Sequence, residues 1–407
     1  MMINLKDIQD AHGRIQSGIK HTAFRLLESL DERIIRDNEL YLKFENRQVT
    51  NAFKERGGRN KLLLLDDKQK AKGVIAASAG NHAQAIARHA GLLGIPSTII
   101  MPKGTPFNKV QSTKKYGANV ILKGDIFDEA KVFAIEMSKE QGLVFCDPFD
   151  DEAVIAGQGT LALEMLADVP DLDVILVPVG GGGLISGMAI AAKEINPKIQ
   201  IIGVQSEIFP YVYAKLNHQE IAHPKARTLA EGIAVKQPGM LTFEIIQNYV
   251  DDILLISERH IEDAINFLLE KEKVLAEGAG AAALAAYMAY SEKFSGQKIG
   301  IPITGGNIDM RMLATCLMRG LVRSQKIIAL SILLDDVPGG LALTAQTISD
   351  KGGNVIEVQH QRQFGNAAGN QVTLDVTVET QDKAHAHEIL EALHQKGFNV
   401  ELKMADD

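Results

Sequence analysis

Four consecutive glycines, Gly180 to Gly183, form the stretch of this sequence best suited to bind an anion. They follow the apolar run VILVPV (174–179) and precede a predicted helix that begins near Leu184. Such a loop exposes backbone N–H groups at a helix N-terminus, where the helix dipole also favours negative charge. The loop therefore predicts a phosphate site, with a tight turn for close helix packing as the alternative interpretation.

Two common phosphate-binding patterns do not match this loop. A P-loop needs Gly-Lys-Ser/Thr, whereas Leu184-Ile185-Ser186 follow the glycines. The dinucleotide fingerprint GxGxxG needs a third glycine at the position of Ile185. The expected ligand is thus a phosphate that belongs neither to ATP nor to NAD.

Three further stretches carry polar groups at points where the chain turns. The loop SAGNH, Ser78 to His82, either caps a helix or binds a carboxylate or a cofactor oxygen through its amides and Asn81. The stretch TGGN, Thr304 to Asn307, either turns the chain or offers a hydroxyl to a heterocycle nitrogen. In AEGAGAAALAAY (276–287), Glu277 either caps a core helix or supplies a buried polar group near a site.

Lys54 lies in NAFKERGG (51–58), and this stretch alone is typical of a solvated, charged helix start. A phosphate site, a hydroxyl for a ring nitrogen and a lysine amine fit one cofactor when they occur together. We therefore predict that Lys54 is chemically active.

Short apolar runs alternate with longer amphipathic segments from about residue 39 to 325. Apolar strands separated by helices indicate an α/β fold, with a parallel sheet covered on both faces and ligand sites at the carboxyl ends of its strands. Examples of these runs are GVIAA (73–77), STIIM (97–101), NVILK (119–123), VILVPV (174–179), IQIIGV (199–204) and IGIPI (299–303).

The pattern changes after about residue 325, where the predicted order becomes strand-helix-strand-strand-helix-strand. That order predicts a ferredoxin-like βαββαβ sandwich over residues 326–407. Apolar residues alternate with polar ones from Val372 to Val378, which predicts one buried and one solvated face. The polar QFGNAAGN (363–370) is the expected hairpin tip.

Composition excludes several classes of protein. A net charge of -8 leaves no basic surface for nucleic acid or an anionic membrane. No apolar run reaches the ~18 residues of a membrane span, and GAGAAALAAYMAY is predicted to be a buried helix. The N-terminus lacks the apolar core of a secretory signal. Cys146 and Cys316 lie far apart without CxxC spacing, so we expect reduced thiols and a cytoplasmic protein.

The stretches FENRQVTNAFKERGG, SAGNHAQ, GQGT, GGGGLISG and ITGGN resemble the pyridoxal-phosphate enzymes of fold type II, the tryptophan-synthase-β type. More closely, they resemble threonine dehydratase, also called threonine ammonia-lyase. The C-terminal DDVPGGLA…GGNVIEVQH resembles an ACT domain. The resemblance covers nearly the whole chain and implies a catalytic domain over residues 1–325, with a smaller subdomain of about 52–155, and a regulatory domain over 326–407.

The resemblance implies a role for each matching residue. Lys54 would bind pyridoxal 5′-phosphate covalently as the Schiff-base lysine, with Phe53 beside the cofactor ring. Asn81 would hydrogen-bond the 3′-oxygen, and Thr304 would face the pyridine nitrogen. The phosphate would be held by Gly180, Gly181, Gly182, Gly183 and Leu184. The carboxylate of a small amino-acid substrate would be received by Ser78, Ala79, Gly80, Asn81 and His82.

The ACT-like part implies an amino-acid effector and assembly into a homodimer or homotetramer. The positions that match effector contacts are Asp336, Val337, Pro338, Gly339 and Asn354. The alternative interpretation is that the Pro-Gly pair only turns the chain.

Three positions depart from the family's usual pattern. Ala52 replaces the Ser that normally precedes Phe-Lys, and Ala79 replaces the second catalytic Ser of serine racemases, which argues against racemisation. Glu207 matches one ligand of the family's divalent metal site. Tyr213 stands where an acidic ligand is usual, so we expect no metal.

The reaction implied by the resemblance is conversion of L-threonine to 2-oxobutanoate and ammonia by β-elimination, with L-serine as a further substrate that gives pyruvate. A serine or 3-hydroxyaspartate ammonia-lyase, or a β-replacement enzyme, is the alternative within the same fold. An amino-acid-sensing protein with an inert catalytic domain is the alternative from another class.

Overall fold

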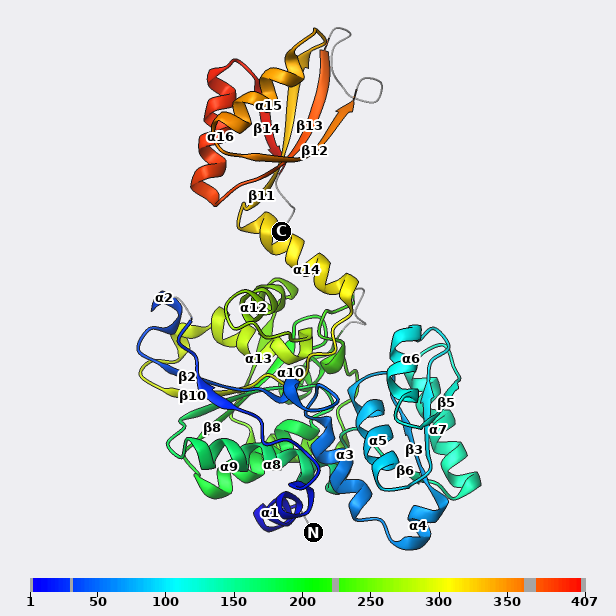
Figure 1. The fold of residues 1–407 in the computed structure, drawn as a ribbon. Helices are drawn as coiled ribbons and strands as arrows, with labels where there is room; N and C mark the ends of the chain where they lie inside the picture. The colour runs from blue at the N-terminus through cyan, green and yellow to red at the C-terminus, as the bar shows by residue number, and fades with distance from the viewer. Residues whose placement is uncertain (1–2, 30–31, 222–226, 362–370, 404–407) are drawn as a thin grey trace. The chain divides into compact units, whose positions relative to one another are not determined.

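The computed structural model describes residues 3–29, 32–221, 227–361 and 371–403 (Figure 1). The chain divides into two compact units, Met1–Asp309 and Met310–Asp407. Helix α14 (Met310–Arg323) therefore belongs with the second unit, whereas the sequence placed the boundary 16 residues later, at 325.

A six-stranded sheet forms the centre of the first unit, in the order β1-β2-β10-β7-β8-β9. All neighbouring strands are parallel except β1 and β2. The central strand β7 is buried at every residue, as its uninterrupted apolar sequence predicts. The strands are β1 (Phe24–Leu26), β2 (Glu39–Lys43), β10 (Lys298–Pro302), β7 (Val174–Pro178), β8 (Gln200–Ser206) and β9 (Asp252–Ile256).

A second, four-stranded sheet in the order β5-β4-β3-β6 is entirely parallel. Together the two sheets confirm the α/β class and all six strands predicted from apolar runs. The sequence analysis did not predict β1, β2, β6 or β9, and β1 and β6 are too short to show a periodic pattern. The strands of this sheet are β3 (Val74–Ala77), β4 (Ser97–Met101), β5 (Asn119–Leu122) and β6 (Val144–Phe145).

Helices cover both sheets on both faces, as Figure 1 shows. Helices α8 and α9 pack on one face of the larger sheet, and α13, the predicted buried helix, packs on the other. In the smaller sheet α5 and α7 lie on opposite faces. The longer helices of this unit are α1 (Leu5–Ile15), α3 (Lys54–Leu63), α5 (Asn81–Leu92), α6 (Phe107–Lys114), α7 (Phe127–Gln141), α8 (Glu152–Asp168), α9 (Gly183–Ile195), α11 (Met240–Tyr249), α12 (Glu258–Glu270) and α13 (Gly278–Ala289).

Short helices complete the first unit. They are α2 (Glu32–Ile35), α4 (Asp67–Lys72), α10 (Tyr211–Leu216) and the 3₁₀ turns η1 (Glu45–Arg47), η2 (Glu231–Ile233) and η3 (Ser291–Lys293). No helix among the described residues is both long enough and apolar enough to traverse a bilayer.

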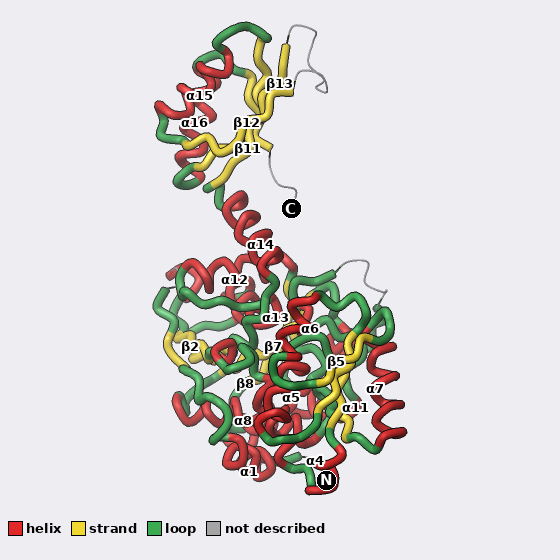
Figure 2. Tube along the Cα trace, turned by 45° about the vertical axis from the view of Figure 1, so that its right-hand side comes forward, coloured by secondary structure: helices red, strands yellow, loops and turns green. Residues whose placement is uncertain are grey.

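The second unit has the predicted ferredoxin-like βαββαβ order. Figure 2 shows its helices α15 and α16 on one face of the sheet. Its four antiparallel strands follow the order β12-β13-β11-β14. Alternate residues of β13 are buried, as the sequence predicted. The expected hairpin tip at 363–370 lies outside the described residues. The elements are β11 (Ile327–Asp335), α15 (Gly340–Asp350), β12 (Asn354–Gln361), β13 (Gln371–Glu379), α16 (Lys383–Gln395) and β14 (Asn399–Lys403).

Candidate active site

Lys54 is the first residue of α3, and its side chain is half-buried. Its ammonium donates a 2.6 Å hydrogen bond to the carbonyl oxygen of Pro148. Burial lowers the pKa of the Lys54 amine to about 8, although the Asp147 carboxylate opposes the shift. Because the amine loses its proton more readily than a solvated lysine does, it is suited to act as a nucleophile and a base.

The charged run after Lys54 is not solvated. Glu55 and Arg56 are both fully buried and bind partners on neighbouring elements. The interpretation of NAFKERGG as an exposed helix start is therefore wrong, since those charges are neutralised inside the protein rather than by water.

The four glycines join β7 to α9, at the carboxyl end of the strand. Gly182 has a φ of 97°, a conformation that side chains rarely adopt. A Cβ at Gly181 would lie 2.2 Å from the ring of Phe149, so the loop also needs glycine for packing. The first amides of α9 have no partner within the helix and can bind an anion.

Phe149 connects this loop to Lys54, because the adjacent Pro148 accepts the lysine's hydrogen bond. The predicted phosphate loop packs against Phe149, and the predicted reactive amine binds Pro148, so two consecutive residues link the loop to the amine. The close packing that the alternative interpretation required is present, and the glycines also leave amides at a helix N-terminus, so the phosphate site stays a prediction.

The loop from Ser78 to His82 joins the end of β3 to the start of α5. The Ser78 hydroxyl accepts a 3.1 Å hydrogen bond from the Gly80 amide, which shapes the turn. Ala79 and Gly80 are half-buried, and a Cβ at Gly80 would meet no atom within 4 Å, so the loop borders open space. That space can admit a ligand carboxylate.

His82 is buried, and its Nε2 lies 2.9 Å from the carbonyl oxygen of Cys146. Burial and the nearby Lys54 charge lower the pKa of the imidazole to about 4. His82 is therefore neutral near pH 7, and its buried Nδ1 has no hydrogen-bond partner among the described residues. The neutral His82 imidazole therefore contributes a polar but uncharged side chain to the site.

Asn81 is held by a chain of side-chain hydrogen bonds. Its Nδ2 donates to Glu277 Oε1 at 2.6 Å, and its Oδ1 accepts from Asn307 Nδ2 at 2.7 Å. Asn307 Nδ2 also donates to the Thr50 carbonyl oxygen at 2.8 Å. Because both ends of the Asn81 amide are engaged, its second Nδ2 hydrogen points in a fixed direction.

Glu277 is the N-cap residue of α13, and burial raises the pKa of its carboxyl against the opposing Asn81 hydrogen bond. The sequence left its role open between helix cap and site residue. Its side chain forms no cap hydrogen bond and binds Asn81 instead, so the structure favours the site residue.

Thr304 follows β10, and its hydroxyl donates a 3.3 Å hydrogen bond to the Ala279 carbonyl oxygen. The Phe53 amide donates to the Thr304 carbonyl oxygen at 3.0 Å, and Ala52 forms an isolated bridge with Gly305. A Cβ at Gly305 would lie 2.4 Å from Glu277 Oε1. These contacts bring Thr304, the residues before Lys54 and the Asn81 chain into one site.

The structure therefore gathers the predicted residues of the first unit around one site. Sequence reasoning did not assign a role to Asn307, Pro148 or Asp147. Asn307 donates a hydrogen bond to Asn81, Pro148 accepts one from Lys54, and the Asp147 carboxylate raises the pKa of the Lys54 amine against the effect of burial. Asn307 ended a quoted motif, which was a usable signal. Pro148 and Asp147 stand in an acidic loop after β6 that no pattern distinguishes.

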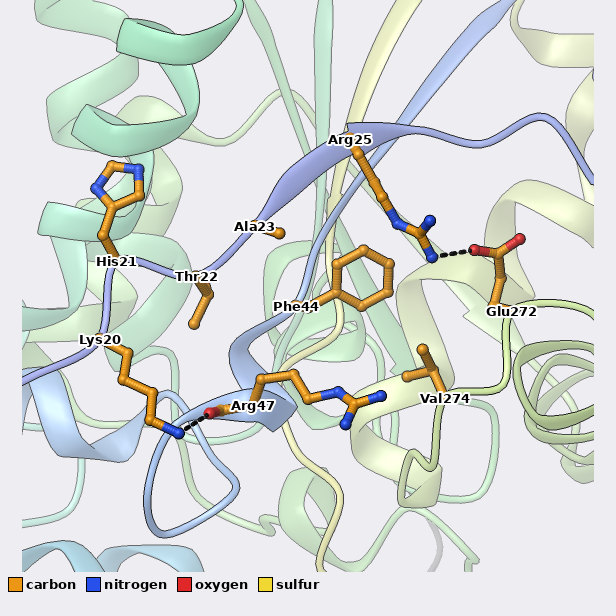
Figure 3. A pocket seen from close by; sticks show the side chains of 9 residues that line it. All are labelled: Lys20, His21, Thr22, Ala23, Arg25, Phe44, Arg47, Glu272 and Val274. Atoms are coloured by element: carbon orange, nitrogen blue, oxygen red, sulfur yellow. Dashed lines mark hydrogen bonds and ion pairs between the residues drawn. The ribbon is translucent and has the colours of Figure 1, made fainter.

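A separate pocket of about 370 Å³ opens beside β1 (Figure 3). Its Arg25 guanidinium pairs with Glu272 at 2.8 Å and lies 5.0 Å from the centre of the Phe44 ring. None of the predicted site residues lines it. The pocket is lined by Lys20, His21, Thr22, Ala23, Arg25, Phe44, Arg47, Glu272 and Val274.

The candidate effector residues lie in the second unit. Residues 336–339 form an exposed turn between β11 and α15, and Gly339 has a φ of 101°. Asn354 begins β12, and its side-chain Nδ2 donates a 3.0 Å hydrogen bond to the Glu379 carboxylate. The described residues contain no group of three or more His, Cys, Asp or Glu side chains placed to hold a metal ion.

The family of pyridoxal-phosphate dependent enzymes matches residues 15–305 of the chain. The chain belongs to this family. Its cofactor is therefore pyridoxal phosphate, and the residues present fit that group. Three features carry the fit. Lys54 is half-buried and its pKa is lowered, the glycine loop runs into the N-terminus of α9, and Thr304 offers a buried hydroxyl rather than a charged group.

Individual relatives agree with the family. The L-threonine ammonia-lyase of Thermotoga maritima is 43% identical over 402 residues, which cover 98% of this chain and 100% of that protein. Threonine deaminase isoform 2 of Solanum lycopersicum, in its processed form, superposes with a TM-score of 0.73 at 33% identity, over 77% of this chain and 86% of that one. Maize serine racemase superposes with a TM-score of 0.72 at 34% identity, over 80% of this chain and 100% of that one.

Proposed function

We propose that the chain is an L-threonine ammonia-lyase, which converts L-threonine to 2-oxobutanoate and ammonia and also accepts L-serine. The observation that carries this proposal is the end-to-end similarity to the Thermotoga maritima enzyme, which includes the second unit. The site supports it with an amine of lowered pKa beside a loop that borders open space. Release of 2-oxobutanoate from threonine by the purified protein is the direct test.

Lys54 has two tasks in this proposal. Its neutral amine would hold the cofactor covalently, and the same amine would accept the proton from the substrate Cα. A pKa of about 8 leaves part of the amine unprotonated near neutral pH, which both tasks require. The bound cofactor supplies an electron sink for the substrate Cα.

The remaining residues hold the two ligands. The phosphate would be held by Gly180, Gly181, Gly182, Gly183 and Leu184. The loop from Ser78 to His82 would receive the substrate carboxylate. Asn81 would hold the 3′-oxygen of the cofactor with its second Nδ2 hydrogen, which has no role in the bond to Glu277. Phe53 would pack beside the cofactor ring. The Lys54 ammonium lies 5.1 Å from the centre of the Phe53 ring, so the two side chains are already adjacent.

Thr304 selects the type of reaction. A hydroxyl at the pyridine nitrogen does not keep that nitrogen protonated, so the electron sink is weaker than with a carboxylate partner. Elimination would tolerate a weaker sink, because the electron pair left at the substrate Cα expels the β-hydroxyl group rather than having to be stored. Ala79 supports elimination over racemisation, since it offers no second hydroxyl to reprotonate Cα.

Serine and 3-hydroxyaspartate ammonia-lyase remain the competing functions. Oxo-acid release measured in parallel with threonine, serine and 3-hydroxyaspartate separates them, and no release from threonine would reject our proposal. An inert sensor would purify without the visible absorbance of bound cofactor.

The second unit is proposed to be an ACT domain that binds an amino-acid effector through Asp336, Val337, Pro338, Gly339 and Asn354. An exposed turn beside a strand edge supports this role. Turnover with and without isoleucine, valine and serine tests it. We further propose a cytoplasmic homodimer or homotetramer, to be checked by cell fractionation and by mass in solution.

A further inference from the structure

The first turn of α3, which begins with Lys54, receives little stabilisation from the helix itself. Phe53, the N-cap, forms no side-chain cap hydrogen bond. Gly57 and Gly58 follow, and each glycine costs about 1 kcal/mol relative to alanine inside a helix. Gly57 has no room for a side chain, because a Cβ there would lie 2.4 Å from Gln158 Nε2 in α8. Groups outside α3 must therefore fix the position of Lys54.

Arg56 is held between two buried carboxylates on the α8 side of the helix. Its guanidinium donates two 2.8 Å hydrogen bonds to Glu45, and bonds of 2.7 and 2.8 Å to Glu164. Burial alone would raise the pKa of the Glu164 carboxyl, but Arg56 and Lys43 outweigh it and lower the pKa to about 2. Two bidentate pairs fix the guanidinium plane, and with it the backbone two residues after Lys54.

This cluster extends outward from Arg56 to the pocket of Figure 3. The fully buried Lys43 ammonium lies 2.8 Å from Glu164 and donates to the Thr22 carbonyl oxygen at 2.7 Å. The Thr22 hydroxyl, at the edge of the pocket, donates to Glu45 at 2.6 Å. Two cations thus balance two anions, which a buried cluster needs to be stable.

Glu55 holds the opposite side of the same turn. Its carboxylate accepts a hydrogen bond from the Thr50 amide and pairs with Arg88 at 3.0 Å and His89 at 3.2 Å. Burial alone would raise the pKa of the Glu55 carboxyl, but His89 and the Thr50 amide outweigh it and lower the pKa. Because Arg88 and His89 belong to α5, this carboxylate ties the turn to the smaller sheet's helix.

We propose that Glu55 and Arg56 are positioning residues for Lys54, each anchoring the first turn of α3 to a different neighbour through a buried charge cluster. Glu55 anchors it to α5, and Arg56 anchors it to η1 and α8. The inference rests on the proposed covalent role of Lys54. It explains why two adjacent charges are buried beside the reactive amine in a helix that lacks a side-chain cap.

The test compares Arg56→Lys and Glu55→Gln with the unaltered holoenzyme. Lysine keeps the charge but cannot form two bidentate pairs. Since a displacement of about 1 Å can cost 100-fold in rate, we expect kcat to fall about 100-fold in Arg56→Lys and about 10-fold in Glu55→Gln. The KM for threonine should change less than about threefold, because neither side chain contacts the substrate loop.

A second readout reports the position of the amine itself. The rate of covalent attachment of pyridoxal phosphate to the apoenzyme should rise with pH through a midpoint near 8 in the unaltered protein. If Lys54 moves towards solvent, desolvation weakens and the midpoint rises towards that of an ordinary lysine. Asp147, whose carboxylate also acts on Lys54 electrostatically, is unchanged in both variants.

Lys61→Met is the matched control. Lys61 lies near the other end of α3 and pairs with Asp151 at 2.5 Å, so its loss weakens the same helix while the Glu55 and Arg56 clusters stay intact. We expect a lower melting temperature with unchanged kcat and midpoint. If Arg56→Lys does not fold, Glu55→Gln decides, because the partly exposed Arg88 can be hydrated.

The possible results separate the two claims. If borohydride reduction of the unaltered holoenzyme does not label Lys54, the proposed function itself fails. If Lys54 is labelled but the variants keep both kcat and midpoint, the positioning role is wrong and the function stands. A loss of kcat that Lys61→Met shares, with the midpoint unmoved, also overturns the positioning role.

Discussion

The first turn of α3 and the turn between β11 and α15 both carry residues that the sequence assigned to a ligand, yet they are built differently. Lys54 stands beside Glu55 and Arg56, whose charges are buried and paired. The turn at residues 336–339 is exposed throughout, and Val337 is 62% accessible. Its shape comes from backbone geometry, including the hydrogen bond from the Val337 amide to the Asp335 carbonyl oxygen at 2.8 Å.

The difference teaches how a reactive group and a regulatory contact are specified. Buried, paired charges fix the backbone beside the reactive side chain, and burial itself lowers the pKa of the Lys54 amine. An exposed turn fixes only the backbone and leaves its side chains free to adapt to a ligand. Changes in the first region should therefore alter chemistry, whereas changes in the second should alter only the response to an effector.

Replacement of Lys54 should have the largest effect. We expect Lys54→Met to lower kcat/KM by at least about 1,000-fold, since one residue serves as both nucleophile and base. The apoenzyme should melt no lower than the unaltered protein at pH 7. The pKa of the amine in the folded state, about 8, lies below its ordinary value, so the protonated amine disfavours folding at pH 7 and a methionine removes that cost. A marked loss of thermal stability would contradict this account.

Gly181→Ala should weaken cofactor binding by about 10- to 100-fold. A Cβ at this position would lie 2.2 Å from the Phe149 ring, and overpacking of this kind costs about 1–3 kcal/mol. Equilibrium titration of the apoenzyme with pyridoxal phosphate measures the change. Gly13→Ala is the control, because a Cβ there meets no atom within 4 Å, and it should leave cofactor affinity unchanged.

Glu277→Gln should lower kcat about 10-fold while the protein stays folded. The neutral amide keeps the size of the carboxyl but weakens the hydrogen bond that orients Asn81, and bonds to charged groups contribute about 1.5–3 kcal/mol. Because burial already raises the pKa of Glu277, loss of its charge should not reduce thermal stability. Steady-state kinetics beside Asp171→Asn, an exposed surface carboxylate paired with Lys298, would show whether the effect is specific to the site.

Local patterns were enough to predict the strands and the binding loops. The apolar run of β7 and the four glycines after it lie next to each other in the chain, so their signal is complete within ten residues. The charge clusters could not be predicted in this way. The carboxylate partners of Arg56 lie 11 and 108 residues away, and Glu277 lies 196 residues from Asn81. Only the fold brings them together, and a Lys-Glu-Arg run reads the same whether it is buried or solvated.

Pro338→Ala should have the smallest effect on turnover without an effector, and should mainly change the apparent affinity for the effector. Pro338 lies in the exposed turn, so its loss should leave kcat and KM without effector within about twofold. Substitution frees the backbone at this position, and an effector must then restrict a more mobile turn, which should weaken its apparent affinity about two- to fivefold. Turnover measured against rising isoleucine or valine would show the shift. A change in basal kcat comparable to that of Glu277→Gln would mean that this turn influences the catalytic site directly, and the contrast between the two regions would fail.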